Sequence, residues 1–323
     1  MMKLGRDFTN LLYFGYLSPD DQRKLEAGEI SVADMDATVQ VPAKGDIAGQ
    51  VAEAKRQGLD HVELDGAVPN PYLGFTEEQK KNAKEAAKKA GITLSLHHPY
   101  TYVGGSVCAP YNEDRKASVE LHKKYLEFAA GIGCKYCVIH PGVVPFYHAV
   151  GKYHDMIRSS LVKSMIELGS LASSKGISFH LENNTAFDGA FFEPEDVCSV
   201  VDEVRQNGVK IYFNLDIGHW FTRADVGRPV PDPPEDVIKK IPDGMFKELH
   251  LNDYVPVKKL FHPPLQEEVG LLKRDNLIRY AQLVKEKGAE LIVIETAVKT
   301  KDQILRRNEI MRCENEFLRQ ILG

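Results

Sequence analysis

The fold is decided by the stretch Val209-Lys210-Ile211-Tyr212-Phe213-Asn214-Leu215-Asp216-Ile217-Gly218-His219-Trp220. Its first five residues form a short, mostly apolar run, which is typical of a buried strand. An aspartate and a histidine then follow, three residues apart, where the strand is expected to end. Parallel α/β proteins place their chemistry at the carboxyl ends of their strands. The stretch therefore predicts a parallel strand with functional side chains at its end.

The same pattern recurs along the chain, because each strand-like run alternates with a helix-like segment that often stops at a glycine. The other predicted strands cover residues 11–14, 61–65, 92–96, 136–139, 177–181, 245–249 and 291–294. About eight strand-helix units are the number that closes a TIM barrel. An open doubly wound sheet is the alternative, but no G-x-G-x-x-G motif follows the first predicted strand. We therefore predict a (β/α)8 TIM barrel with its active site at the carboxyl ends of the strands.

No linker rich in glycine, serine and proline interrupts this rhythm, so residues 1–323 are predicted to form a single TIM-barrel domain. A hydrophobic content of 43% provides for a large core. Residues 1–45 fit the repeat least well, and we assign them to the first strand and an insertion. Residues 301–323 are predicted to form an amphipathic closing helix, whose apolar residues can pack on the barrel or on another subunit of a homo-oligomer.

The composition excludes several classes of protein. A net charge of −5 argues against a nucleic-acid partner, which requires clustered lysine and arginine. We find neither the apolar core of a signal peptide nor a run of roughly 20 apolar residues that could span a membrane. The five cysteines are scattered, and Cys134-Lys135-Tyr136-Cys137 precedes a predicted strand, so we interpret them as packing residues. A soluble, cytoplasmic protein is expected.

The chemistry of the predicted strand ends is that of a metal site. The residues that follow the strands, with one histidine from a loop, are His97, His140, Glu182, Asp216, His219, His250, Glu295 and His262. Imidazoles mixed with carboxylates suit Zn, Mn, Fe or Co better than Mg or Ca. Eight candidates exceed what one tetrahedral site can use. Either more than one metal binds, or some of these residues are catalytic acids and bases.

A histidine or carboxylate can also be a structural residue. We expect the remaining histidines that we weigh to be core residues: His61, His122, His148, His154 and His180. Glu182 and Glu295 each follow an apolar run, where burial without a partner would cost several kcal/mol. They are therefore predicted to bind metal or to act in catalysis. The same interpretation extends to Asp216 and His250.

Seven short motifs carry a family resemblance when they are taken in order. They are His97-x-Pro-Tyr100, His140-Pro-Gly, Leu-Glu182-Asn-Asn-Thr, Leu-Asp216-Ile-Gly-His219, His250-Leu-Asn-Asp, His262-Pro-Pro and Ile-Glu295-Thr. Over about residues 46–300 the series resembles the xylose isomerase-like TIM-barrel superfamily. That superfamily includes sugar isomerases and epimerases, inosose dehydratases and endonuclease IV.

The resemblance to the ketose 3-epimerase branch implies one divalent metal, Mn, Zn or Co in preference to Mg. Its implied ligands are Glu182, Asp216, His250 and Glu295. The two glutamates would exchange a proton at the carbon next to a sugar carbonyl, through a stabilised enediolate. His219, three residues after Asp216, could be a ligand, a residue that orients a ligand or a proton carrier, and we count it among the catalytic candidates. The side chains expected to line the pocket for a small carbohydrate are His97, Tyr100, His140, Trp220 and His262, and the four histidines His97, His140, His219 and His262 are additional ligand candidates.

The resemblance to endonuclease IV implies a different function, a three-zinc phosphodiesterase acting at abasic sites in DNA. All eight residues of the strand ends would then be zinc ligands. That branch expects an aspartate two residues before the last histidine, and this chain has Leu260 there. The acidic balance of the chain also disfavours a phosphate-backbone partner. A metal-free sugar-binding module is a third alternative, and the isomerase or epimerase is the function that we favour.

Overall fold

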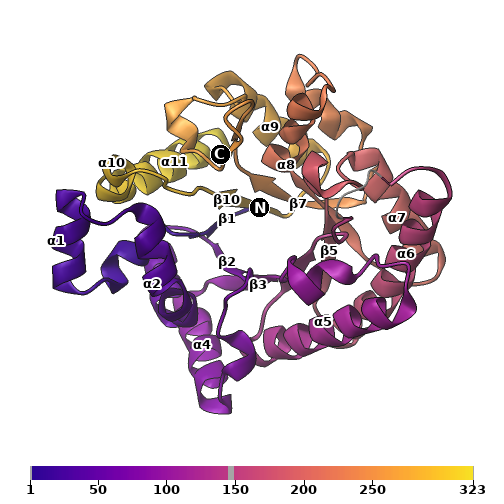
Figure 1. Cartoon of the computed structure of the whole chain (residues 1–323), viewed down its shortest axis with the longest axis horizontal. Coiled ribbons are helices and arrows are strands. Elements are labelled where there is room, and N and C mark those ends of the chain that lie inside the picture. Colours follow the sequence, from indigo (N-terminus) through magenta and orange to yellow (C-terminus); the bar gives the residue numbers. More distant parts are fainter. Residues whose placement is uncertain (1, 145–148, 323) are drawn as a thin grey trace.

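A closed barrel of eight parallel strands forms the centre of the molecule (Figure 1). The computed structural model describes residues 2–144 and 149–322. Around the barrel the strands follow the order β1-β10-β7-β6-β5-β4-β3-β2, so β1 closes the ring between β10 and β2. The barrel strands are β1 (Lys3–Asp7), β2 (His61–Asp65), β3 (Thr93–His97), β4 (Tyr136–Ile139), β5 (Ser178–Glu182), β6 (Tyr212–Asp216), β7 (Phe246–Leu251) and β10 (Leu291–Glu295). The predicted TIM barrel is confirmed.

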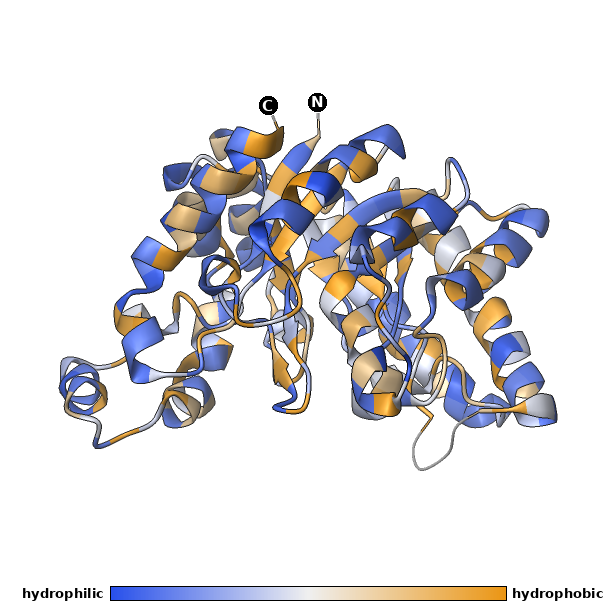
Figure 2. Cartoon of the chain, turned by 90° about the horizontal axis from the view of Figure 1, so that it is seen from above, coloured by the Kyte–Doolittle hydropathy of each residue, from blue (hydrophilic) through white to orange (hydrophobic). Residues whose placement is uncertain are grey.

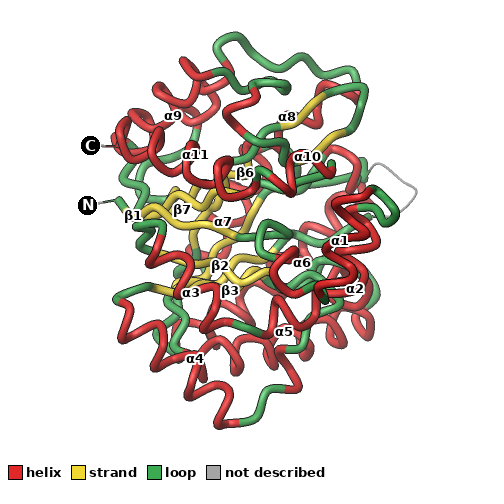
Figure 3. The backbone as a smooth tube through the Cα atoms, turned by 90° about the vertical axis from the view of Figure 1, so that its left-hand side faces the viewer, coloured by secondary structure: helices red, strands yellow, loops and turns green. Residues whose placement is uncertain are grey.

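Helices surround the strands on the outside of the barrel, as the tube in Figure 3 shows. They are α1 (Pro19–Ala27), α2 (Val32–Gly45), α3 (Ile47–Arg56), α4 (Glu77–Ala90), α5 (Asn112–Ile132), α6 (Gly151–Ser174), α7 (Pro194–Gln206), α8 (Ile217–Phe221), α9 (Arg274–Glu286), α10 (Lys301–Leu305) and α11 (Arg307–Leu322). Short 3-10 helices are η1 (Tyr13–Tyr16), η2 (Tyr72–Gly74), η3 (Tyr102–Ser106), η4 (Ala186–Asp188), η5 (Thr222–Val226), η6 (Pro234–Lys240) and η7 (Leu265–Glu267). An antiparallel ribbon of β8 (Tyr254–Val255) and β9 (Leu260–Phe261) completes the elements.

The first strand is not where the sequence pattern placed it. The apolar residues 11–14 are not a strand, and Tyr13 begins the 3-10 helix η1. The strand β1 instead contains Gly5 and the fully buried Arg6. A side chain at Gly5 would collide with the imidazole of His61, so the close approach of β1 to β2 requires glycine there. Arg6 is accommodated outside the barrel by an ion pair of 2.9 Å with Glu314 of α11.

The hydrophobic core lies between the strands and the helices, while the inside of the barrel is unusually polar. In β2, Val62 and Leu64 belong to the outer core, and the alternate residue Glu63 faces the other way with no exposed surface. A small separate apolar cluster is formed by Tyr136, Leu291 and Val293. TIM barrels usually fill this interior with branched apolar side chains. Buried polar residues in its place mark the interior as part of the site.

The ends of the chain meet at one end of the molecule (Figure 2). The predicted closing helix over residues 301–323 is interrupted, because α10 ends at Leu305 and α11 begins at Arg307. Among the described residues, no helix has the length and apolar character needed to cross a membrane.

Several predicted core residues are indeed buried. His61, His122 and His180 have no exposed surface, whereas His154 is partly exposed. His148 lies outside the described residues. Each cysteine thiol is free, and those of Cys134 and Cys137 are buried in the outer core.

Candidate active site

Seven of the eight predicted residues stand at or next to the carboxyl ends of barrel strands. His97, Glu182, Asp216 and Glu295 are the last residues of β3, β5, β6 and β10. His250 lies near the end of β7, and the others follow their strands: His140 after β4 and His219 within α8. The eighth, His262, follows the ribbon strand β9. Because the carboxyl ends of parallel strands share one mouth, residues distant in sequence are brought together.

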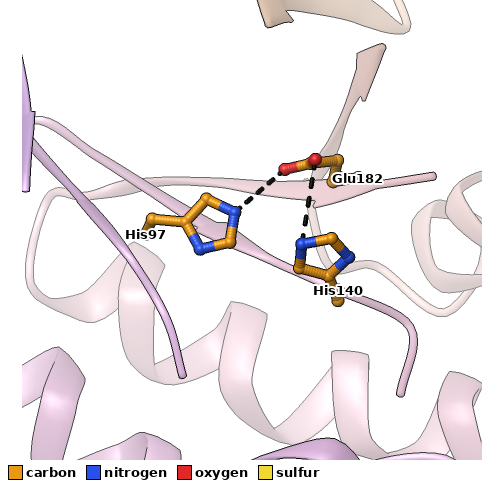
Figure 4. Close-up of side chains that lie close together, drawn as sticks. All are labelled: His97, His140 and Glu182. Atoms are coloured by element: carbon orange, nitrogen blue, oxygen red, sulfur yellow. Dashed lines mark hydrogen bonds and ion pairs between the residues drawn. The ribbon is translucent and has the colours of Figure 1, made fainter. Parts of the chain in front are cut away.

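Glu182 is the centre of an imidazole cluster. Its Oε2 lies 3.2 Å from Nε2 of His97, and its Oε1 lies 3.8 Å from Nε2 of His140 (Figure 4). Nδ1 of His219 approaches Oε1 to 3.1 Å. The glutamate itself is completely buried, so these imidazoles take the place of water around its charge.

His250 connects Glu182 to Glu295. Its Nδ1 lies 3.3 Å from Oε2 of Glu182 and 3.1 Å from Oε1 of Glu295. On the other side of the ring, Nε2 lies 3.1 Å from Oε1 of Glu63. The ring therefore faces two strand-end carboxylates with one nitrogen and a deeper carboxylate with the other. When Nε2 carries the ring proton and donates toward Glu63, Nδ1 has a free lone pair that faces Glu182 and Glu295 and can bind a metal ion.

Asp216 joins the same group through an asparagine. Nδ2 of Asn252 donates to Oδ2 of Asp216 and to Oε2 of Glu295, both at 2.7 Å. The other oxygen of Asp216 accepts from the backbone N–H of His219, which caps the short helix α8. Nδ1 of His219 also lies 3.5 Å from Oδ2 of Asp216. The turn between β6 and α8 thus fixes the aspartate and the histidine together.

The donor atoms fit a divalent cation. Three sets are close enough to share one ion: His97 with His140 and Glu182, Glu182 with Asp216 and His219, and Glu63 with His250 and Glu295. Oε1 of Glu182, Oε1 of Glu63 and both ring nitrogens of His250 are buried without a hydrogen bond in the described chain. Buried polar atoms rarely remain unpaired, and mixed imidazole and carboxylate donors suit first-row transition metals and zinc.

The carboxyl groups of the site differ in their affinity for protons. Burial alone would raise the pKa of Glu182, but His250 and His140 lower it well below its usual range. The pKa of Glu295 is also lowered, because the charges of His250 and His262 outweigh the effect of its burial. Burial, together with the charges of Glu295 and Glu182, raises the pKa of Asp216 to about 7 despite the opposing charge of His219. Two carboxylates of the group thus remain charged while the third holds a proton more readily.

The imidazoles divide in the same way. Burial would lower the pKa of His97, but Glu182 raises it to about 10. The pKa of His219 is raised to about 9, because Asp216 and Glu182 outweigh burial. Burial lowers the pKa of His140 to about 3 and that of His262 to about 4. His140 and His262 are therefore neutral near pH 7 and can act as metal ligands or as hydrogen-bond partners.

A cavity of about 370 Å³ opens over this cluster. Its lining includes four of the predicted histidines (His97, His140, His219 and His262) together with Tyr100 and Glu295. Tyr100 packs against the ring of His140 with 4.9 Å between centroids and keeps 39% of its surface exposed. The residues predicted to line a pocket and described by the structure therefore share one cavity, with one exception.

Trp220 is the exception, because it does not line the cavity. It is 1% exposed, and its indole N–H donates to Oε2 of Glu193 at 3.3 Å. The guanidinium of Arg223 lies 5.1 Å from the indole ring. The helical turn of α8 carries the side chain of residue 220 away from that of His219, since successive helical residues point in different directions. Trp220 anchors α8 in the outer core.

Three polar residues of the site were not selected from the sequence. Glu63 stands inside β2 instead of at its end, Asp7 ends a strand that was placed elsewhere, and Asn252 lies in a quoted motif without an assigned role. An available signal was the acid within residues 61–65, because a charged residue at an alternate position of a short strand faces the barrel interior.

Residues 51–321 match the family described as xylose isomerase-like TIM barrel. Among curated proteins, an uncharacterized protein of Methanocaldococcus jannaschii is 29% identical over 144 residues, which are 44% of this chain and 52% of that protein. The chain spans about half the length of the curated relatives it matches.

Solved structures share the barrel at low sequence identity. D-psicose 3-epimerase from Clostridium cellulolyticum H10, solved with D-tagatose, has a TM-score of 0.66 and 15% identity and covers 100% of both chains. A xylose isomerase-like TIM barrel protein from Mycobacterium smegmatis, in complex with magnesium, has a TM-score of 0.57 and 16% identity, covering 87% of this chain and 90% of that chain. At such identities the likeness establishes the fold.

Proposed function

The chain belongs to the xylose isomerase-like TIM barrel family, and from this premise we propose that it is a divalent-metal-dependent isomerase or epimerase of a sugar or sugar derivative. The observation that carries the proposal is the convergence of Glu182 and Glu295 on one nitrogen of His250, at 3.3 and 3.1 Å. Two carboxylates and an imidazole at the carboxyl ends of the strands, with Glu295 lining the cavity, suit proton transfer beside a carbonyl. The similarity to sugar 3-epimerases such as that of Clostridium cellulolyticum supports the same class.

Glu182, Asp216, His250 and Glu295 are the residues that we propose to hold the cation. A divalent metal ion there would supply a Lewis acid that polarises the substrate carbonyl and stabilises the negative charge of an enediolate. Their side chains are already connected, because Asn252 ties Asp216 to Glu295 and His250 bridges both glutamates. His97 and His140 provide a further set with Glu182, so a second ion is compatible with the arrangement.

The chain's own contribution to the reaction is proton transfer. We assign the removal of the proton next to the carbonyl to one of Glu182 and Glu295, and its return to the other. The pKa values of both glutamates are lowered, so either can accept the proton at neutral pH, and the glutamate that returns a proton must first take one up. His219 contacts Glu182 and Asp216 and is placed to hold or pass on the proton. Tyr100 and His140 would flank the substrate on the opposite wall of the cavity.

Hydrogen exchange is the experiment that tests this function without knowing the product. The purified protein, supplied with Mn, Co, Zn or Mg, would be incubated with D-fructose or D-tagatose in D2O. We expect deuterium at the carbon next to the carbonyl, measured by NMR after the metal is chelated. Glu182→Gln and Glu295→Gln should lower the exchange rate at least ~10³-fold, as loss of an acid or base does.

Glu235→Gln is the matched control, because Glu235 is also buried but pairs with Arg279 away from the mouth. It should retain both exchange and metal content. Full activity and full metal content in Glu182→Gln would overturn the proposal.

The convergence of all eight strand-end residues also keeps the endonuclease IV-like function as a second candidate. The same three sets of donors could hold more than one zinc ion. However, Leu260 occupies the position of the expected carboxylate, and it lies on the short strand β9 next to His262. Metal-dependent nicking of a duplex that contains one abasic site, abolished by EDTA, would place this function ahead of the first.

A further inference from the structure

The cavity has two chemically different walls. On one side are the imidazoles of His97 at the end of β3, His140 after β4 and His219 in α8. On the other side stand Glu295, Asp7 and Asp65, the last residues of β10, β1 and β2. Asp7 is paired in register with Glu295, so it is one strand beyond a proposed catalytic carboxylate. A substrate bound at Glu295 would therefore extend toward Asp7.

The two aspartates of this wall differ in their partners. Both oxygens of Asp65 have partners within the protein, because Nζ of the buried Lys44 lies 2.8 Å from its Oδ2 and the N–H of Ala67 donates to its Oδ1. Asp7 is 93% buried, at 7% exposure, and its Oδ1 accepts from the backbone N–H of Thr9 at 2.6 Å. No donor of the described residues reaches its Oδ2, although Asp7 lines the cavity. That oxygen has a free acceptor position.

The acidic wall disfavours an anionic substrate. Burial raises the pKa of Asp7 well above its usual value, and the charges of Asp65 and Glu295 raise it further. The same negative potential would repel a phosphate group. Moreover, three carboxylates around a divalent cation leave a net charge of −1 in the proposed ligand set.

Cations that could hold a phosphate are scarce in the cavity. Lys299 is the one lysine among the described lining residues, which include no arginine, and it stands exposed at the rim. Residues 145–148, outside the described part, are Pro-Phe-Tyr-His and can add neither residue type. Phosphate sites usually combine arginine, lysine and backbone N–H groups at the start of a helix.

We propose that the site takes an uncharged polyhydroxy carbonyl compound, whose hydroxyl donates to Oδ2 of Asp7, and rejects the corresponding phosphate ester. Asp7 is then a specificity-determining residue that reads a hydroxyl beyond the reacting carbons. The identity of the reaction rests on the proposed function, whereas the discrimination between the two compounds is a property of binding. The two can therefore fail separately.

Calorimetric titration of the Mn-supplied protein with D-fructose, D-tagatose and D-fructose 6-phosphate tests the proposal. The free ketoses should bind at least about tenfold more tightly than the phosphate ester. Asp7→Asn should weaken the binding of at least one free ketose by about tenfold, since the amide nitrogen that takes the place of Oδ2 cannot accept the hydrogen bond of the substrate hydroxyl. The same variant should also reduce the discrimination against the phosphate ester.

Two further variants complete the design. Asp243→Asn removes the same charge from an exposed residue that pairs with Lys287, and it should leave every affinity unchanged. Lys299→Gln should leave the affinity for the free ketoses within twofold. Equal or tighter binding of the phosphate ester, or no effect of Asp7→Asn, would overturn the proposal. Failure to bind either free ketose would also overturn it.

Turnover separates this inference from the proposed function. Selective binding of free ketoses without exchange of the carbon-bound hydrogen would retain the inference and remove the isomerase or epimerase assignment. Hydrogen exchange at equal rates on the free and the phosphorylated ketose would retain the isomerase or epimerase assignment and remove the inference on specificity.

Discussion

Glu182 and Glu314 are buried to nearly the same extent, but their surroundings differ. Glu314 lies outside the barrel, where Oε2 pairs with Arg6 at 2.9 Å and Oε1 accepts from Leu265 and Thr296 at 2.9 and 3.0 Å. Glu182 lies at the carboxyl end of β5, and its Oε1 makes no hydrogen bond to any described residue, although imidazoles surround it. The protein supplies hydrogen-bond partners to both oxygens of Glu314 but leaves one oxygen of Glu182 without a partner. A buried carboxylate therefore indicates a functional site only where hydrogen-bond partners are missing.

Removal of the metal should have the largest effect on the free energy of unfolding, and this effect should depend on Glu182. If the mouth binds a cation at about a thousandfold above its dissociation constant, the bound ion adds about 4 kcal/mol to the free energy of unfolding. Urea unfolding with and without EDTA would measure the effect in the wild-type protein. Glu182→Gln should be much less sensitive to EDTA, while an equal response of both proteins would contradict the assignment of Glu182.

Removing the ion pair between Glu314 and Arg6 should lower the stability of the protein and leave metal binding unchanged. Glu314→Gln leaves the buried Arg6 without its charge partner, which should lower the free energy of unfolding by about 3 kcal/mol. Urea unfolding would measure this loss, and metal content per folded molecule should stay unchanged. Glu309→Gln, on the same helix but exposed, is the control and should change stability by less than ~0.5 kcal/mol. Loss of metal in Glu314→Gln would show that the two regions are coupled.

Glu63 should sharpen the comparison, because it stands behind His250 and not in the cavity lining. Glu63→Gln removes the charge that faces Nε2 of His250 at 3.1 Å. We expect metal affinity to fall roughly 10–100-fold, as is typical when a group that orients a histidine ligand is replaced. Competition with a metal-sensitive dye would measure the affinity. The buried Glu235→Gln should keep the wild-type value, and an unchanged affinity in Glu63→Gln would remove this role.

Trp220 should give the smallest effect on catalysis. Trp220→Phe removes one hydrogen bond to Glu193 and part of the packing of α8, which should lower the free energy of unfolding by about 1 kcal/mol. Hydrogen exchange on a ketose should stay within twofold of the wild-type rate, because the indole does not line the cavity. A large loss of exchange at unchanged stability would return Trp220 to the site.

The barrel was predictable because most of its strands combine apolar runs with glycine-ended helices. β1 was missed because it carries few apolar residues, and what stabilises it comes from distant parts of the chain. Position 5 must be glycine because a side chain there would collide with His61. Arg6 is paired with Glu314, which is 308 residues away. Neither requirement leaves a local pattern.

The strand-end histidines and acids were identifiable because each follows its strand directly. Glu63 was not selected, because an acid within a strand has the pattern of a solvent-facing residue unless the strand is already assigned to a closed barrel. Asp7 was hidden by the misplaced first strand. The orientation of Trp220 depends on the helical turn of α8, which begins one residue after β6 and cannot be read from the spacing of the motif alone.

The pairing of β1 with β10 has a consequence for synthesis on the ribosome. β1 is translated before its neighbour β10 and before Glu314, the carboxylate that pairs with Arg6 and lies 308 residues further along the chain. Until β10 and α11 are translated, β1 therefore has an unpaired strand edge, and the guanidinium of Arg6 lacks its carboxylate. Such edges favour association with other chains. Translation of β10 and α11 supplies both missing partners.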